Sequence, residues 1–117
     1  LSGADLRKTD VTGALLMKAR LAGADLQAAN LAKANLTSAN LSEANARKAN
    51  FAGADLTSTD LRWTNLGQAN LSRANLTGAD LSYAGLFKAN LNGAEWSRAR
   101  FCKTIMPDGT INNTGCH

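Results

Sequence analysis

The stretch ADLQAANLAKANLTSANLSEAN, residues 24–45, places a leucine at every fifth position: Leu26, Leu31, Leu36 and Leu41. An α-helix advances about 100° per residue, so five residues overshoot one turn by about 140° and the leucines would spiral around its surface. A flat strand alternates its faces, so an odd spacing would put successive leucines on opposite sides. Because neither element can bury them together, the period predicts a chain that turns a corner after each short extended piece.

The five-residue period runs through most of the 117-residue chain. Of the 21 positions from 1 to 101, 16 are Leu, and the 21 positions from 4 to 104 comprise 17 Ala and four Thr. The positions between them, from 5 to 105, are Asp or Asn 15 times. We therefore expect Leu to fill an interior, the small residue to fit a tight corner, and Asp or Asn to face outward.

Composition excludes several classes of protein. The hydrophobic residues are mainly Ala and Leu, aromatic residues make up 5%, and no apolar run approaches the roughly 18 residues of a membrane span. The net charge of +4 comes from scattered Lys and Arg, so we expect no nucleic-acid partner and no membrane association. Leu1 is already in phase with the repeat, which is compatible with the removal of upstream sequence.

The units ADLQA, ANLAK, ANLTS, ANLSE, ADLSY and ANLNG resemble those of the pentapeptide-repeat family. This resemblance implies an all-β fold, a right-handed quadrilateral β-helix with four pentapeptides in each 20-residue coil. We expect about five such coils over residues 1–105, followed by an irregular C-terminal capping tail over residues 106–117.

Stacking at 20 residues makes specific predictions about the columns of the helix. Ala46 and Phe51, the large departures from Leu in mid-chain, fall in the same coil, so a deficit and an excess of core volume are neighbours. The outward amides of one column are predicted to hydrogen-bond up the stack as an Asn ladder; its members are Asn30, Asn50, Asn70 and Asn90.

The repeat ends at the C-terminus. The last coil of an open β-helix has unpaired backbone groups, which would pair with another chain unless they were capped. After Phe101 the chain reads CKTIMPDGTINNTGCH, in which PDG indicates a turn. Bulky residues keep the five-residue phase, and we expect Trp96, Phe101 and Met106 to plug the last coil. The tail resembles MPDG-type endings of cyanobacterial and plastid members of the family.

The two cysteines favour a staple across this cap. Cys102 and Cys116 flank a turn-rich segment and are predicted to form a disulfide, with two free thiols as the alternative. Adding His117 gives three potential metal ligands where a structural zinc site needs four, so no metal is expected. A disulfide would imply an oxidising space, which favours the periplasm or thylakoid lumen over the cytoplasm.

Outward aromatic residues supply the candidate partner patch. Trp63 and Tyr83 share a column one coil apart, Phe87 lies on the adjoining face, and Arg62 is beside them. Exposed aromatic and arginine side chains are typical of binding patches. Stacking of the two rings without any partner is the alternative.

No catalytic constellation is present, because His117 is the only histidine and a hydrolase triad needs a base beside its nucleophile. We therefore expect no enzyme and no cofactor, but a structural scaffold for an unidentified protein partner, as a monomer or weak homodimer. The alternative is a DNA mimic that modulates a topoisomerase such as gyrase, as the resemblance implies for some members. A mimic needs a continuous carboxylate stripe, whereas the pI is near 9.4.

Overall fold

A computed structural model describes residues 1–116, and its building unit is a β-turn in every pentapeptide. In the repeat that starts at Phe51, the N–H of Ala54 donates to the C=O of Phe51 across 2.9 Å. The third residue of this turn, Gly53, has a φ of 67°, as in a type II turn. Positive φ recurs at the same position of every repeat from 3 to 103. The chain therefore turns a corner every five residues.

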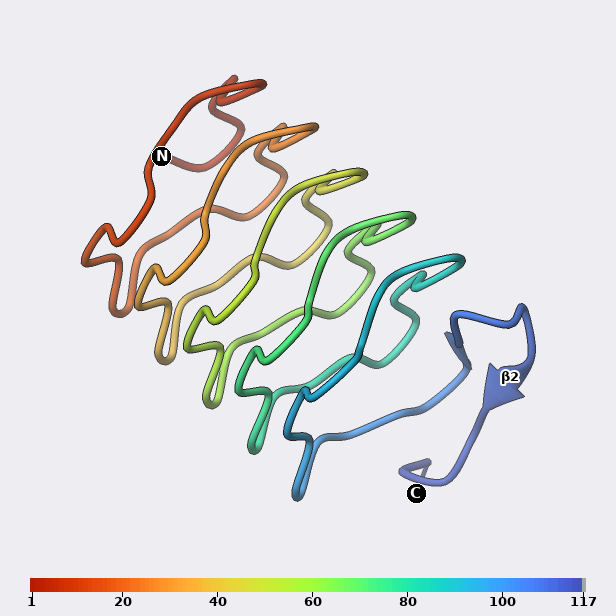
Figure 1. The fold of residues 1–117 in the computed structure, drawn as a ribbon. Coiled ribbons are helices and arrows are strands. Elements are labelled where there is room, and N and C mark those ends of the chain that lie inside the picture. The colour runs from red at the N-terminus through yellow and green to blue at the C-terminus, as the bar shows by residue number, and fades with distance from the viewer. Residues whose placement is uncertain (117) are drawn as a thin grey trace.

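Successive coils pair in parallel with a register of 20 residues. The first bridge joins Asp5 to Asp25 and the last joins Gly85 to Ile105, with a bridge at every fifth residue between them. Backbone hydrogen bonds run in both directions along the stack, since each bridged segment of the inner coils lies between two others. The coils consequently stack along one axis, with the two termini at opposite ends (Figure 1).

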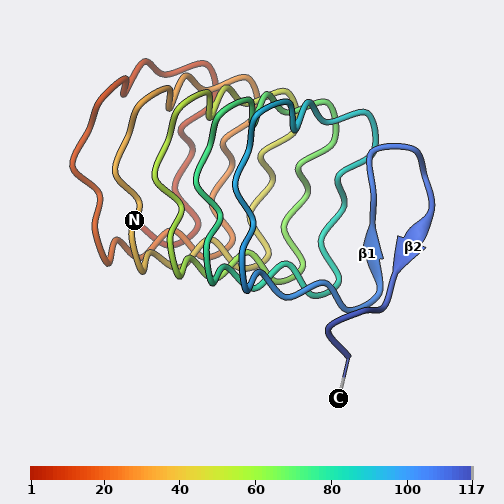
Figure 2. The ribbon, with the colours of Figure 1, turned by 60° about the horizontal axis from the view of Figure 1, so that its bottom comes forward.

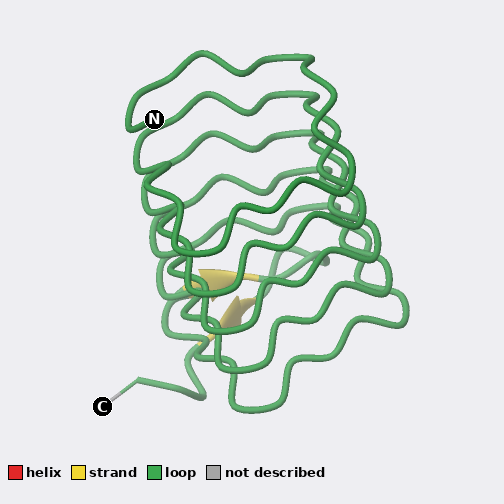
Figure 3. Cartoon of the chain, turned by 90° about the vertical axis from the view of Figure 1, so that its left-hand side faces the viewer, coloured by secondary structure: helices red, strands yellow, loops and turns green. Residues whose placement is uncertain are grey.

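Continuous strands are scarce in the described residues. The structure has two, β1 (Thr104–Ile105) and β2 (Ile111–Asn112), which pair antiparallel near the C-terminus (Figures 2 and 3). The expected strands of the coil walls are reduced to one bridged residue in each pentapeptide, because the left-handed turn residue interrupts extended backbone. No helix within residues 1–116 is long and apolar enough to cross a membrane.

The molecule is less elongated than the rod expected of a β-helix. The principal extents are 33 × 26 × 23 Å, so the long axis exceeds the widths by little. Each coil uses 20 residues of chain to gain only about 4.8 Å of height. A chain of this length therefore forms a stack whose long axis of 33 Å is only moderately greater than its widths of 26 and 23 Å.

The interior consists of the stacked leucines. Those from Leu21 to Leu86 are at most 1% exposed, and each such burial contributes roughly 1.5–3 kcal/mol. Ala46 and Phe51 are both 0% exposed, so both lie in the interior columns as the 20-residue register requires.

Threonines replace alanine at the tight corner without leaving a polar group unsatisfied. Thr59, Thr64 and Thr104 are at most 1% exposed. Each hydroxyl donates to a carbonyl 23 residues earlier, as in the 2.7 Å bond from Thr64 to Leu41. A hydrogen-bonded hydroxyl avoids the penalty of burying an unpaired donor, so the corner accepts Thr as well as Ala.

The C-terminal end is covered on part of its cross-section. Phe101 is buried and Met106 packs against the core, whereas Trp96 is 44% exposed and meets Phe101 edge-on with ring centroids 6.1 Å apart. The β1–β2 hairpin adds one further layer on a single face of the stack, as its place in Figure 2 shows. Trp96 therefore closes its own column only in part.

Leu66→Asp should prevent folding, because it places an unpaired carboxylate in a column where Leu66 is 0% exposed. Lys48→Ala changes a solvent-exposed corner residue and should alter the free energy of unfolding by no more than about 0.5 kcal/mol. Circular dichroism and thermal melting measure both effects. Equal melting temperatures for the two variants would contradict the register.

Candidate functional site

The outward Asp and Asn residues act within their own turns. Each of the 15 accepts a hydrogen bond at Oδ1 from the backbone N–H two residues later. In Asn50 the acceptor lies 2.9 Å from the N–H of Ala52. This geometry is the Asx-turn, a side-chain mimic of a backbone turn.

The predicted Asn ladder is therefore wrong in its hydrogen bonding. Backbone bridges do align the column formed by Asn30, Asn50, Asn70 and Asn90. Among the described residues, however, no side-chain hydrogen bond joins one of these amides to the next. Oδ1 of each amide accepts instead from the backbone N–H two residues later in its own turn.

Hydrogen bonds hold several of these carboxylates, Asp5, Asp10 and Asp60 among them, as anions. The hydrogen bond from Arg7 lowers the pKa of Asp5 to about 2, and the hydroxyl of Thr12 lowers the pKa of Asp10. The Arg62 guanidinium, 2.7 Å from Asp60, likewise lowers the pKa of that carboxyl. A general acid needs a pKa raised toward neutrality, whereas these pKa values move away from it.

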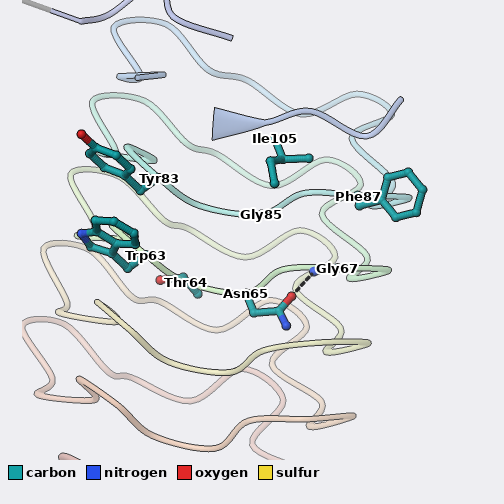
Figure 4. A pocket seen from close by; sticks show the side chains of 8 residues that line it. All are labelled: Trp63, Thr64, Asn65, Gly67, Tyr83, Gly85, Phe87 and Ile105. Carbon is teal, nitrogen blue, oxygen red and sulfur yellow. Dashed lines mark hydrogen bonds between the residues drawn. The ribbon is translucent and has the colours of Figure 1, made fainter. Parts of the chain in front are cut away.

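The predicted patch residues divide into two groups. Trp63 and Tyr83 stack with ring centroids 4.2 Å apart and planes 7° from parallel, and Phe87 stands across a shallow groove from them (Figure 4). Arg62 is not part of the groove lining, because its guanidinium is turned to Asp60. The structure thus brings together the three aromatic residues and leaves the arginine outside.

The groove, which we call the aromatic groove, has a volume of about 340 Å³ and draws its lining from three coils. Its residues are Trp63, Thr64, Asn65, Gly67, Tyr83, Gly85, Phe87 and Ile105. Ile105 is 41% exposed, and Gly67 and Gly85 leave the floor without bulky side chains (Figure 4). An open hollow with apolar walls is a common form of binding site.

Sequence reasoning missed the floor of the aromatic groove. A signal for it exists: Gly85 and Ile105 both interrupt the Asp/Asn position of the repeat, in consecutive coils of the same column.

Two lysines also border the aromatic rings. Lys103 Nζ lies 5.7 Å from the Tyr83 ring centroid, and Lys88 Nζ lies 5.4 Å from that of Phe87.

Cys102 and Cys116 form the predicted disulfide, with an S–S distance of 2.03 Å and a Cα–Cα distance of 4.7 Å. The tail is also held by the N–H of Gly115, which donates to the C=O of Phe101 across 2.7 Å. Both thiols are consumed, so neither is available as a thiolate ligand. His117, the third residue considered for a metal, lies outside the described residues.

Comparison with protein families identifies the repeat. A family model described as pentapeptide repeats matches eight copies, within residues 1–31, 24–62, 34–72 and 54–93. The chain belongs to the pentapeptide-repeat family. The 20-residue register and the turn in every unit are accordingly those of a pentapeptide-repeat β-helix, which in this family is right-handed and quadrilateral.

Solved structures of other pentapeptide-repeat proteins resemble this one. Rfr23 of the cyanobacterium Cyanothece 51142 is 38% identical, with a TM-score of 0.76 over 77% of this chain and 62% of its own. The plasmid-mediated fluoroquinolone resistance protein QnrB1 is 25% identical, with a TM-score of 0.51 over 79% of this chain and 47% of its own. A thylakoid-lumen protein of Arabidopsis thaliana is 28% identical, with a TM-score of 0.49 over 97% and 83%.

This pentapeptide-repeat chain therefore spans less than two thirds of the length of Rfr23 and of QnrB1. No curated protein matches its sequence. The comparisons establish the family and the fold, and they leave the partner to be argued from the surface.

Asn50→Ala should lower the free energy of unfolding by about 1 kcal/mol, because the N–H of Ala52 loses its acceptor. Asn50→Asp keeps an oxygen at the same place and should stay close to wild type. Urea denaturation compares the two variants. Equal losses would show that the Asx hydrogen bond contributes nothing.

Reduction of the disulfide should loosen the C-terminal tail. For a sequence separation of 14 residues, the chain-entropy model gives a loss of about 3 kcal/mol. Thiol titration in denaturant should find no free thiol before reduction, and hydrogen exchange at Gly115 should accelerate after it. Two free thiols in protein purified without reductant would contradict the staple.

Proposed function

We propose that this pentapeptide-repeat protein is a non-enzymatic scaffold that binds another protein through the aromatic groove. The main evidence for this proposal is that four exposed apolar side chains lie together on one face of the molecule. Trp63 is 59%, Tyr83 40%, Phe87 50% and Ile105 41% exposed. Apolar surface gathered in one place is typical of a protein-binding site, and aromatic residues dominate the energetics of such sites.

The stack beneath the groove supplies a rigid support. We take residues 1–105 as about five coils and residues 106–117 as a capping tail. The groove lining lies on neighbouring coils whose backbone is hydrogen-bonded on both sides. Binding residues on such a support lose little conformational freedom when a partner docks. We propose that the protein is a monomer or weak homodimer when no partner is bound.

A DNA mimic that modulates gyrase is the second candidate, and the charges disfavour it. QnrB1 is a fluoroquinolone resistance protein of the same fold. In the present chain the net charge is +4, and the carboxylates of one column stop after two coils, where Asp5 and Asp25 are followed by Asn45 and Asn65. A surrogate for phosphates needs an uninterrupted acidic stripe.

The disulfide bears on the compartment. A bond between Cys102 and Cys116 persists in an oxidising space and is rare in a reducing cytoplasm. We therefore favour the periplasm or the thylakoid lumen as the location of the protein.

Replacing Trp63, Tyr83 and Phe87 together with Ala should keep the fold and abolish partner capture. Loss of the ring stack should cost about 1 kcal/mol of stability, which thermal melting measures. The variant and the wild type are each used as bait for affinity capture from an extract of the oxidising compartment. The proteins bound to each bait are then identified and compared.

The matched control is Leu15→Ala with Met17→Ala, which removes exposed apolar side chains from another face. Proteins captured by wild type and control, but not by the triple variant, are those that use the groove. Identical capture by all three would move the contact elsewhere. Inhibition of DNA supercoiling by purified gyrase would favour the second candidate.

A further inference from the structure

Gly85 is a glycine that the fold does not require. It occupies the outward position that is Asp or Asn in every repeat from 25 to 80. Its φ lies outside the left-handed region, and a Cβ added there would meet no atom within 4 Å. Neither backbone conformation nor packing therefore explains the absence of a side chain.

The glycine has two consequences for the aromatic groove. It leaves an open place on the floor between Tyr83 and Phe87 (Figure 4). It also removes the acceptor of an Asx turn, so the N–H of Phe87 has no hydrogen-bond partner among the described residues. One coil earlier, the equivalent N–H of Gly67 donates to Asn65 Oδ1 across 2.9 Å.

This donor faces the aromatic groove. Asn65 Oδ1, the acceptor one coil earlier, bonds to the N–H of Gly67, and both residues belong to the groove lining (Figure 4). Because the coils repeat at a register of 20 residues, the N–H of Phe87 points to the corresponding place beside Gly85. A bound chain can fill that place with a carbonyl oxygen.

The two charged groups that lie over the rings of the aromatic groove are lysines. Lys88 Nζ lies over the Phe87 ring on one side of the groove, and Lys103 Nζ lies over the Tyr83 ring on the other. No Asp or Glu lines the groove. Glu43 borders a separate hollow with Trp63. Charge complementarity therefore favours an acidic ligand.

We infer that Gly85 opens a subsite for an extended acidic segment of a partner protein, anchored by one aromatic side chain. The anchor lies over Gly85 between the Trp63–Tyr83 stack and Phe87, while the N–H of Phe87 donates to a carbonyl of the bound segment. Carboxylates on either side of the anchor face Lys88 and Lys103. This inference rests on the proposed function and specifies its partner.

The test uses the peptide acetyl-Glu-Asp-Phe-Asp-Glu-amide as the probe. Titration is followed by calorimetry and by the NMR shift of the Phe87 amide proton. Wild type should bind, with affinity that falls as salt is raised. Peptides with Lys in place of the acids, or with Ala in place of Phe, should bind at least about tenfold more weakly, since each lost contact of about 1.4 kcal/mol is a factor of ten.

Gly85→Asn separates binding from folding. The new amide supplies the Asx acceptor for Phe87 and fills the floor, so stability should be at least that of wild type while peptide affinity falls at least tenfold. Arg20→Asn is the matched control, because it places Asn at the same repeat position on another coil, away from the groove. It should leave peptide affinity unchanged.

Several outcomes would overturn the inference: equal affinity of Gly85→Asn and wild type, equal affinity for the basic peptide, or a homodimer that Gly85→Asn dissociates. If wild type does not bind the acidic peptide, but the triple alanine variant fails to capture the protein that wild type captures, the inference is wrong and the proposed function stands. If the triple variant retains its captured protein, the proposed function itself fails.

Discussion

The structure depends on a backbone constraint that recurs every five residues, a left-handed residue at the third position of each turn. Fifteen of these positions hold residues other than glycine, and each costs on the order of 1 kcal/mol or more. The surroundings compensate for this cost. At Lys48, for example, the N–H donates to Gly67 of the next coil across 2.9 Å, while Ala46 and Phe51 on either side are fully buried. A corner so held projects its side chain outward, which is why Trp63 and Tyr83 stack at the spacing of the coils.

Hydrogen bonding closes each pentapeptide almost independently of its neighbours' side chains. The Asx turn satisfies an N–H on the outside, and a threonine such as Thr64 satisfies its own hydroxyl on the inside. Within residues 1–116, no buried side-chain nitrogen or oxygen lacks a partner. Outward residues can therefore change without endangering the stack, and function can be placed on a face by a few substitutions. Gly85 is such a substitution, because it sacrifices a turn hydrogen bond that the fold uses elsewhere.

The surface that results differs from its surroundings in shape and in charge. In most repeats an outward Asp or Asn is tied into its own turn, whereas the aromatic groove combines exposed rings, an open floor and a free backbone donor. Lysines border it, while the acids of the chain are largely engaged in their own turns, as with Asp5 and Asp60. The structural similarity to Rfr23 concerns the β-helix fold that carries this face. The face itself arises from residues that depart from the repeat.

The sequence by itself determined the architecture, because a period of five with Leu and Ala at fixed places admits neither helix nor flat strand. It also determined the interior columns, including the positions of Ala46 and Phe51, and it favoured the disulfide that the structure contains. Only the tertiary structure decided where the polar side chains of the repeat point. Asn50 bonds to its own turn rather than to the next coil, and Arg62 turns to Asp60 and away from the rings, because backbone angles place those partners nearest. The floor of the aromatic groove was decided in the same way. Asn65, Gly85 and Ile105 are 20 residues apart in the chain and become neighbours only when the coils stack.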